Sequence, residues 1–357
     1  MKHYAVVTAA MLAATGGANA GGVERSAQSV AILFEPGRYV ELSFGHFAPD
    51  VGGTVGAASS GDMAPSFNSW SLGYKMDIGE RLDFAMVLDQ PIGADVAYPG
   101  TPGPGSYPLA GSTAKLTSSA ITALVRYSFE NNVSVYGGLR YQTVHGEVGL
   151  TGGYTMETNH DSELGYVVGL AWEKPEIAAR VALTYNSAIT HSLESVEAGF
   201  PPAGFDTEIP QSVNLEFQTG IAKDMLLFGS IRWVDWSEFV IDPPNYISPG
   251  PNPNLPLVGY PKDRITYNLG IGRRFNETWS GAVTLGYEPS DGELTGNLGP
   301  TDGFKSIGVA ATYTRDNLKI TGGVRYVELG DATTNIVSAS FIDNSGVGVG
   351  VRIGYSF

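Results

Sequence analysis

Basic side chains stand at alternate positions of several apolar segments, where they would share one face of a β-strand. The candidate ligand-binding residues among them are Arg126, Arg140, Arg232 and Arg352. A guanidinium attracts a carboxylate by its charge and by charged hydrogen bonds, so such a face suits an anionic headgroup. In the alternative, acids on the same faces pair with the cations and brace the structure; these acids are Asp83, Asp89, Glu216 and Glu288.

Motifs for catalysis or metal binding are not found in the sequence. There is no G-x-S-x-G, Walker or H-E-x-x-H pattern, and the glycine-rich "GVGVGVRIG" does not match G-x-G-x-x-G. The histidines after residue 20 stand singly, without metal-ligand spacing: His46, His145, His160 and His191. The formal net charge of −15 disfavours nucleic-acid binding. We therefore expect no enzyme, no cofactor, no metal site and no nucleic-acid partner.

The elements that would position these side chains are strands, because apolar and polar residues alternate with a period of two. The predicted cores are 38–47, 67–77, 81–90, 114–129, 132–145, 163–173, 176–189, 209–222, 224–238, 263–275, 278–288, 303–315, 317–329 and 343–357. Most are about ten residues or longer, the length that a tilted strand needs to cross a bilayer. The pattern predicts fourteen strands.

The segments between these strands alternate between short and long. The short ones are "DIGE", "FENN", "EKPE", "AKD", "RFNET" and "RDN". The long ones are 48–66, 91–113, 146–162, 190–208, 239–262, 289–302 and 330–342. Tight periplasmic turns and long external loops are typical of outer-membrane barrels, so we expect an all-β, antiparallel transmembrane β-barrel.

The two faces of each strand differ in chemistry. Around residue 140, Leu139 and Tyr141 share one face, and Arg140 and Gln142 share the other. An apolar face turned to lipid and a polar face turned to a lumen explain this division. Because backbone groups in hydrocarbon must all be paired, the last strand is expected to close the barrel by pairing with the first.

The first residues have the pattern of a secretory signal peptide. A basic start, a short apolar stretch and "ANA" at Ala18–Ala20 predict a signal over residues 1–20. Residues 21–37 are predicted to be a short plug in the lumen, and 38–357 the barrel. We expect export to a Gram-negative outer membrane, with lipid and lipopolysaccharide as surroundings. The terminal Phe357 resembles the signature of chains inserted by the barrel-assembly machinery.

Several stretches resemble the FadL family of outer-membrane long-chain fatty-acid transporters (OmpP1/FadL/TodX-like). The strongest is "PQSVNLEFQTGIAKDMLLFGSIRWVDWSEF", with W-x-x-W-S at Trp233, Trp236 and Ser237, and "DRITYNLGIGRRFNETWSGAVTLGYEPS" follows in kind. The family's Asn-Pro-Ala element is missing, and "EPG" at Glu35–Gly37 stands near its place. The resemblance implies passive diffusion of a long-chain fatty acid or a related hydrophobic molecule, with lateral exit through the wall near the third strand.

Pro91 and Gly93 are the candidates for this lateral opening, since proline cannot donate to a strand ladder. Their other interpretation is the start of an ordinary loop. Phe34, Phe200 and Phe205 are candidate contacts for an apolar ligand. In the alternative, Phe34 fixes the plug to the wall, and the apolar loop residues pack on each other. The rival functions are a general water-filled porin and an adhesin or structural barrel.

Overall fold

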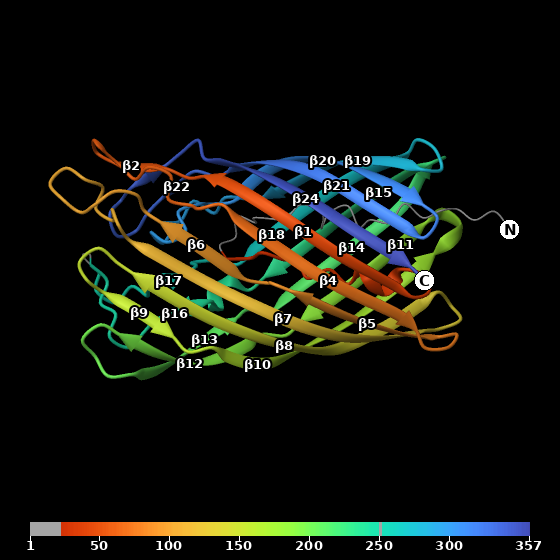
Figure 1. Cartoon of the computed structure of the whole chain (residues 1–357), viewed down its shortest axis with the longest axis horizontal. Helices are drawn as coiled ribbons and strands as arrows, with labels where there is room; N and C mark the ends of the chain where they lie inside the picture. Colours follow the sequence, from red (N-terminus) through yellow and green to blue (C-terminus); the bar gives the residue numbers. More distant parts are fainter. Residues whose placement is uncertain (1–22, 250–251) are drawn as a thin grey trace.

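The computed structural model describes residues 23–249 and 252–357, which form one closed antiparallel barrel of fourteen wall strands (Figure 1). The wall strands are β1 (Tyr39–Asp50), β4 (Phe67–Asp77), β5 (Leu82–Asp89), β7 (Thr113–Ser128), β8 (Val133–Gly149), β10 (Asp161–Lys174), β11 (Ala179–Asn186), β14 (Ser212–Ala222), β15 (Met225–Val234), β18 (Arg264–Arg274), β19 (Trp279–Glu288), β20 (Phe304–Arg315), β21 (Leu318–Leu329) and β24 (Ser345–Ser356). The predicted signal peptide, 1–20, and residues 21–22 of the predicted plug lie outside the described residues.

The barrel closes between its first and last strands. β1 pairs with β24 from Tyr39 opposite Ser356 to Asp50 opposite Ser345, and its other edge pairs with β4. The predicted closure is therefore confirmed, and the chain continues as a strand almost to Phe357 because this ladder needs it. Short turns lie at one end of the barrel and long loops at the other (Figure 1).

Most segments predicted as loops contain short strands, and in two of them, 190–208 and 146–162, the strands extend the barrel, so there the prediction was wrong. Residues 190–208 form most of a hairpin of β12 (Ile189–Glu197) and β13 (Ala203–Ile209). Burial alternates along β12, which is the mark of a strand. In the predicted loop 146–162, β8 runs on to Gly149 and β9 (Thr155–Thr158) pairs with it. The barrel thus extends at its loop end beyond the predicted wall.

Shorter elements lie at the loop end, in the lumen and, in the case of β6 (Gly93–Ala97), in the wall beside β7. The short strands are β2 (Gly53–Val55), β3 (Ala58–Ser59), β6 (Gly93–Ala97), β16 (Val240–Ile241), β17 (Val258–Gly259), β22 (Ala332–Thr333) and β23 (Ser340–Phe341). The 3-10 helices are η2 (Ala31–Phe34), η3 (Pro175–Ile177) and η4 (Trp236–Glu238). Among the described residues, no helix has the length and apolarity to cross a membrane.

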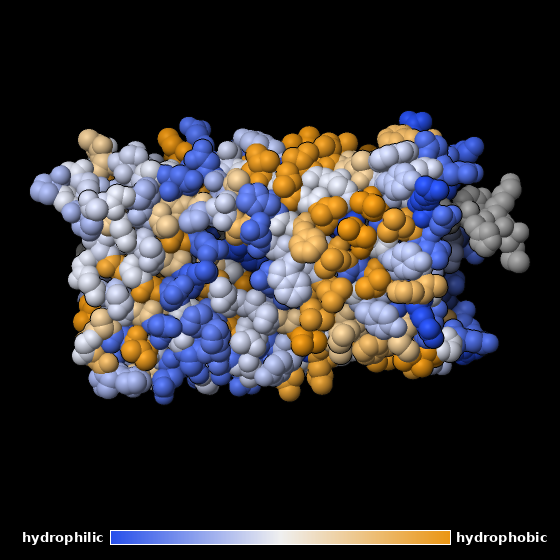
Figure 2. All heavy atoms as spheres, viewed as in Figure 1, coloured by the Kyte–Doolittle hydropathy of each residue, from blue (hydrophilic) through white to orange (hydrophobic). Residues whose placement is uncertain are grey.

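The outer surface of the wall carries large apolar side chains. Leu139, Leu164 and Val349 are 58%, 61% and 46% exposed, whereas the neighbouring inward Arg140 is 7% exposed. Figure 2 shows such residues gathered across the half of the barrel nearer the short turns. A continuous apolar belt of this kind suits acyl chains rather than water.

A charge placed on this belt should destabilise the barrel in lipid. We expect Leu139→Arg to lower the free energy of unfolding of the protein in lipid vesicles by about 2–4 kcal/mol, because a cation near the bilayer midplane loses its hydration. Leu139→Val is the matched control and should cost far less. Urea titration of the protein in vesicles measures both. An unchanged stability of Leu139→Arg would show that this surface does not face hydrocarbon.

Candidate functional site

The N-terminal segment, residues 23–38, lies inside the barrel. Its apolar stretch "VAILF" contains η2 (Ala31–Phe34), and Val30, Ile32 and Leu33 are at most 4% exposed. They belong to one buried cluster with wall residues that include Leu124 and Tyr136. Burial of apolar side chains thus holds this short helix against the inner wall without the support of a longer element.

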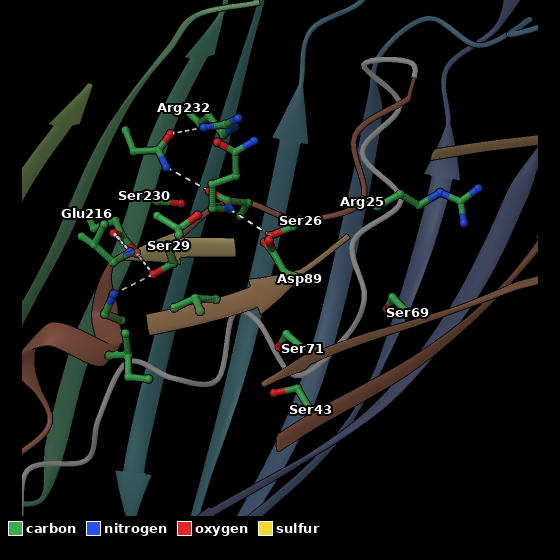
Figure 3. A pocket seen from close by; sticks show the side chains of 18 of the residues that line it. Arg25, Ser26, Ser29, Ser43, Ser69, Ser71, Asp89, Glu216, Ser230 and Arg232 are labelled. Carbon is green, nitrogen blue, oxygen red and sulfur yellow. Dashed lines mark hydrogen bonds between the residues drawn. The ribbon is translucent and has the colours of Figure 1, made fainter. Parts of the chain in front are cut away.

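Polar contacts fix the same segment to strands on several sides of the lumen. The Ser26 hydroxyl donates to Asp89 of β5 at 2.8 Å, and the Ser29 hydroxyl donates to Glu216 of β14 at 2.5 Å (Figure 3). Glu35 pairs with Lys319 of β21 at 3.0 Å. Because these strands lie apart around the barrel, the segment crosses the lumen.

Glu24 and Arg232 form the most enclosed ion pair of this region. Their side chains are 5% and 6% exposed, and Arg232 Nε donates to Glu24 Oε1 at 2.8 Å. Arg232 Nη1 also donates to the Ser212 hydroxyl at 3.0 Å and to the Asn214 side-chain oxygen. Arg232 is therefore a docking partner of the N-terminal segment in this structure.

The other predicted arginines also meet protein partners. Arg126 binds Asp83 at 2.7 Å and Glu173 at 2.9 Å, and it does not line the lumen cavity. Arg140 donates to Thr122 at 3.0 Å and to Gln28 of the N-terminal segment. These contacts support the bracing network for both residues.

Arg352 and Phe34 differ in their access to the lumen. Arg352 lines the cavity and donates to Ser43 at 3.1 Å, with Glu41 at 3.7 Å. Phe34 lies between the guanidinium groups of Arg126 and Arg180, at 4.7 and 4.4 Å from its ring centre. Phe34 therefore packs against the wall, in line with the second of its two predicted roles.

Arg325 is a cavity residue that the sequence prediction did not single out as a ligand contact. It projects from β21, its Nη2 atom is buried, and that atom hydrogen-bonds to no protein group. The only described aromatic contact of its guanidinium is the Phe304 ring, at 5.2 Å. A buried guanidinium nitrogen that lacks an acceptor is costly, so this group is suited to receive an anion.

The lumen cavity lies between the N-terminal segment and the wall. Its volume is about 180 Å³, and hydroxyl, amide and charged side chains are prominent in its lining, among them Ser43, Asn268, Arg325 and Arg352. Sites for drug-sized molecules usually measure about 300–1,000 Å³. A long ligand would therefore fit only if the N-terminal segment moved.

The third wall strand is interrupted at residues 90–92. β5 ends at Asp89 and the chain pairs again with β7 from Gly93, so three residues, Gln90–Ile92, face two on β7. Pro91 lies inside this bulge, where its missing N–H costs no ladder bond. Pro91 therefore lies in a break within a wall strand, and Gly93 is the first residue of the resumed pairing.

A second pocket of about 420 Å³ lies among the long loops. Leu255 and Leu257 line it, together with Tyr246, Leu294 and Leu298 from loops 235–263 and 289–303. The predicted contacts Phe200 and Phe205 do not line it: Phe200 is 50% exposed at another depression, and Phe205 lies in β13. Loop 235–263, which is rich in proline, supplies much of the lining of this pocket.

Asp302 anchors one of the loops that line this pocket. Arg264 binds it at 2.8 Å, and the Gly292 N–H donates to it at 2.9 Å. Burial pushes the pKa of Asp302 up, but hydrogen bonds from Ser290, Gly292, Asp291 and Arg264 together outweigh it and lower the pKa below its usual range. The carboxylate therefore stays charged and holds the loop at neutral pH.

The described residues contain no group of three or more His, Cys, Asp or Glu side chains arranged to hold a metal ion. His145 and His160 stack with ring centres 4.3 Å apart at the loop end, and His191 contacts Asp161 at 2.9 Å. Neither arrangement has the ligand number of a structural or catalytic metal centre.

Comparison with known proteins shows similarity in structure alone, since no family model and no curated protein matches the sequence. A Pseudomonas aeruginosa FadL homologue gives a TM-score of 0.74 at 12% identity, covering 92% of each chain. The Pseudomonas putida toluene transporter TodX gives a TM-score of 0.65 at 12% identity, and the match covers 96% of this chain and 98% of that one. The monoaromatic hydrocarbon channel CymD gives a TM-score of 0.60 at 14% identity, and the match covers 91% of this chain and 89% of that one. The fold implied by the sequence resemblance is thereby confirmed.

Proposed function

We propose that this chain is a FadL-type outer-membrane channel through which long-chain fatty acids or related hydrophobic molecules diffuse passively. The observation that carries the proposal is a closed barrel with an apolar outer belt whose lumen is crossed by its own N-terminal segment. The structural neighbours, which are a FadL homologue and hydrocarbon channels, support transport over enzymatic activity.

The crossed lumen favours this function over a general porin. Porins of sixteen to eighteen strands keep an aqueous channel, whereas here a buried ion pair and an apolar cluster tie the N-terminal segment to the wall. A cavity of about 180 Å³ remains beside it. Water and ions would meet an obstruction, while a ligand with affinity for the cavity could displace part of it.

The route of the ligand follows from the three features of the site. The loop pocket of about 420 Å³ is apolar and large enough to capture a hydrophobic molecule from outside. In the lumen, Arg325 is the group best placed to receive a carboxylate, and Arg352 lines the same cavity. The ligand would then leave for the membrane at the strand interruption, residues 90–92, where Phe44 and Trp70 present apolar surface outside.

A monoaromatic hydrocarbon is the second candidate substrate, because TodX and CymD are channels for such molecules. A neutral hydrocarbon makes no use of a guanidinium, whereas a fatty acid does. Removal of a positive charge from the lumen wall should therefore reduce transport of a fatty acid but not of a neutral hydrocarbon.

The test is uptake of labelled oleate and of labelled toluene by cells that carry or lack the protein. We expect oleate uptake to require the protein and to fall about tenfold in Arg325→Met, because one charge-assisted hydrogen bond to the carboxylate is lost. Toluene uptake serves as the control and should not respond to this substitution. Oleate uptake that persists unchanged without the protein would reject the fatty-acid function.

A further inference from the structure

A layer of buried apolar side chains lies between the loop pocket and the lumen cavity. Along the chain, Arg232 of β15 lines the cavity, Val234 at the end of β15 belongs to the layer, and Val240 of β16 lines the loop pocket. Val23 of the N-terminal segment completes the layer from the lumen side. The members from the wall are Ile92, Val144, Ile189, Ile209 and Val234.

Three aromatic rings form the part of this layer that faces the loop pocket. Trp236 and Phe239 are 2% and 0% exposed, and their ring centres are 5.5 Å apart. Tyr260 packs on both rings, 5.3 Å from Trp236 and 5.9 Å from Phe239. Of the three, Tyr260 alone lines the loop pocket. A molecule held in the pocket therefore meets the Tyr260 ring first and the two buried rings behind it.

Trp236 is held in place by the W-x-x-W-S motif, which the proposed function has not so far used. The Trp233 indole N–H and the Ser237 hydroxyl both donate to the Asp263 carboxylate, at 3.2 and 2.7 Å. Asp263 ends loop 235–263, so these bonds join the two ends of the loop. The short helix η4 is thereby fixed, and its Trp236 ring is the stationary member of the three.

Tyr260 is less restrained than the rings behind it. It follows the two-residue strand β17, which lies among the long loops (Figure 1). Its half-buried ring borders the open volume of the loop pocket, about 420 Å³, into which it can turn. The turn breaks two aromatic contacts, which corresponds to roughly a tenfold change in population or somewhat more.

We propose that Tyr260 is a gate between the loop pocket and the lumen cavity and that it sets the width of the hydrophobic molecule that passes. The proposal rests on the proposed transport function and adds its selection step. An acyl chain is narrow and needs a small displacement of the Tyr260 ring, whereas a fused ring system needs the ring to turn away completely. A hydrated ion would lose its hydration in the layer and is not admitted.

The alternative role of Tyr260 is to brace loop 235–263. This loop has other attachments, because the buried Glu197 carboxylate accepts hydrogen bonds from Asn245 Nδ2 at 3.1 Å and from the Tyr154 hydroxyl at 2.7 Å. The Asp263 bonds hold its base. The loop should therefore stay folded without the Tyr260 ring. Loss of a brace would lower transport of every ligand, whereas loss of a gate favours wide ligands.

The first test compares uptake of oleate and of pyrene-labelled dodecanoic acid by cells that carry the full-length protein. We expect Tyr260→Ala to raise the ratio of pyrene-acid uptake to oleate uptake about tenfold, because the two ring contacts no longer have to break. Tyr260→Phe keeps the ring and should keep the wild-type ratio.

Tyr246→Ala is the matched control for this comparison. Tyr246 lines the same pocket and stacks with Tyr154 at 5.2 Å, but it is not part of the apolar layer. Its removal should lower capture of both ligands alike and leave their uptake ratio unchanged.

The second test needs no transport. The native chain has no cysteine, so Ser230→Cys places a single thiol in the lumen cavity beneath the layer. The protein is held in lipid nanodiscs and treated with a sulfonated methanethiosulfonate, which does not cross lipid. We expect Tyr260→Ala to raise the labelling rate about tenfold over the Ser230→Cys parent, and Tyr260→Phe to leave it unchanged. Circular dichroism confirms that each variant is folded.

The outcomes separate the gate from the transport function. A raised uptake ratio and faster labelling in Tyr260→Ala, with neither in Tyr260→Phe, support the gate. An unchanged uptake ratio overturns it, as does equal labelling of Tyr260→Ala and the parent. A wild-type protein that transports neither ligand overturns the transport function, and labelling still decides whether Tyr260 closes the path to the cavity.

Discussion

Removal of residues 22–37 should turn a barrel with little steady conductance into an open ion-conducting pore in planar bilayers. The segment crosses the lumen and contributes buried apolar side chains to it, including Ile32 and Leu33. Water would fill the vacated space, because arginines and acids on the remaining lumen surface favour hydration.

The effect should be large, since conductance changes from near zero to that of an aqueous channel. Deletion of loop residues 101–106 is the matched control, because these residues are exposed or partly exposed and lie in a long loop outside the wall. Its conductance should stay at the wild-type level. A deletion of 22–37 that conducts no better than wild type would mean that other elements obstruct the lumen. A wild-type protein that already conducts freely would favour the porin.

The wall strands were predictable because their physics is local. Apolar and polar residues alternate along each strand, and turn residues stand between strands. These two signals placed β4 at its observed bounds, 67–77, and placed most other strand ends within about three residues. The hairpin of β12 and β13 was missed because it lies beyond the lipid belt, where a glycine- and proline-rich composition resembles a loop. Alternation of apolar and polar residues is a weaker sign of a strand there, since neither face of the strand has to meet hydrocarbon.

The pairing of the lumen charges was not predictable from periodicity. A period of two places Arg232 on the inner face, but its partner Glu24 is 208 positions away in the chain. Only the closed barrel brings them together. The same holds for Arg25 and Asp95, and for Arg325, whose buried Nη2 atom has no protein acceptor. Side-chain type predicted the face, and tertiary structure decided which cations are neutralised.

Arg232→Met should release the docked end of the N-terminal segment, because it removes the positive charge that faces the buried Glu24 carboxylate. Loss of one partner of a buried ion pair costs about 3–5 kcal/mol. Hydrogen–deuterium exchange of the amides of residues 24–26 measures the release. We expect exchange to accelerate by more than about a hundredfold, since about 1.4 kcal/mol corresponds to a tenfold change.

The double variant Glu24→Gln with Arg232→Met shows whether the charge is the cause. Glutamine removes the buried negative charge at nearly constant shape, so exchange should slow again toward the wild-type rate. Arg274→Met is the comparison at a solvent-bordering pair, where the side chains are 31% and 27% exposed, and should change little. If the double variant exchanges as fast as Arg232→Met alone, packing rather than charge holds the segment. The pair of Glu24 and Arg232 would then be a consequence of docking and not its cause.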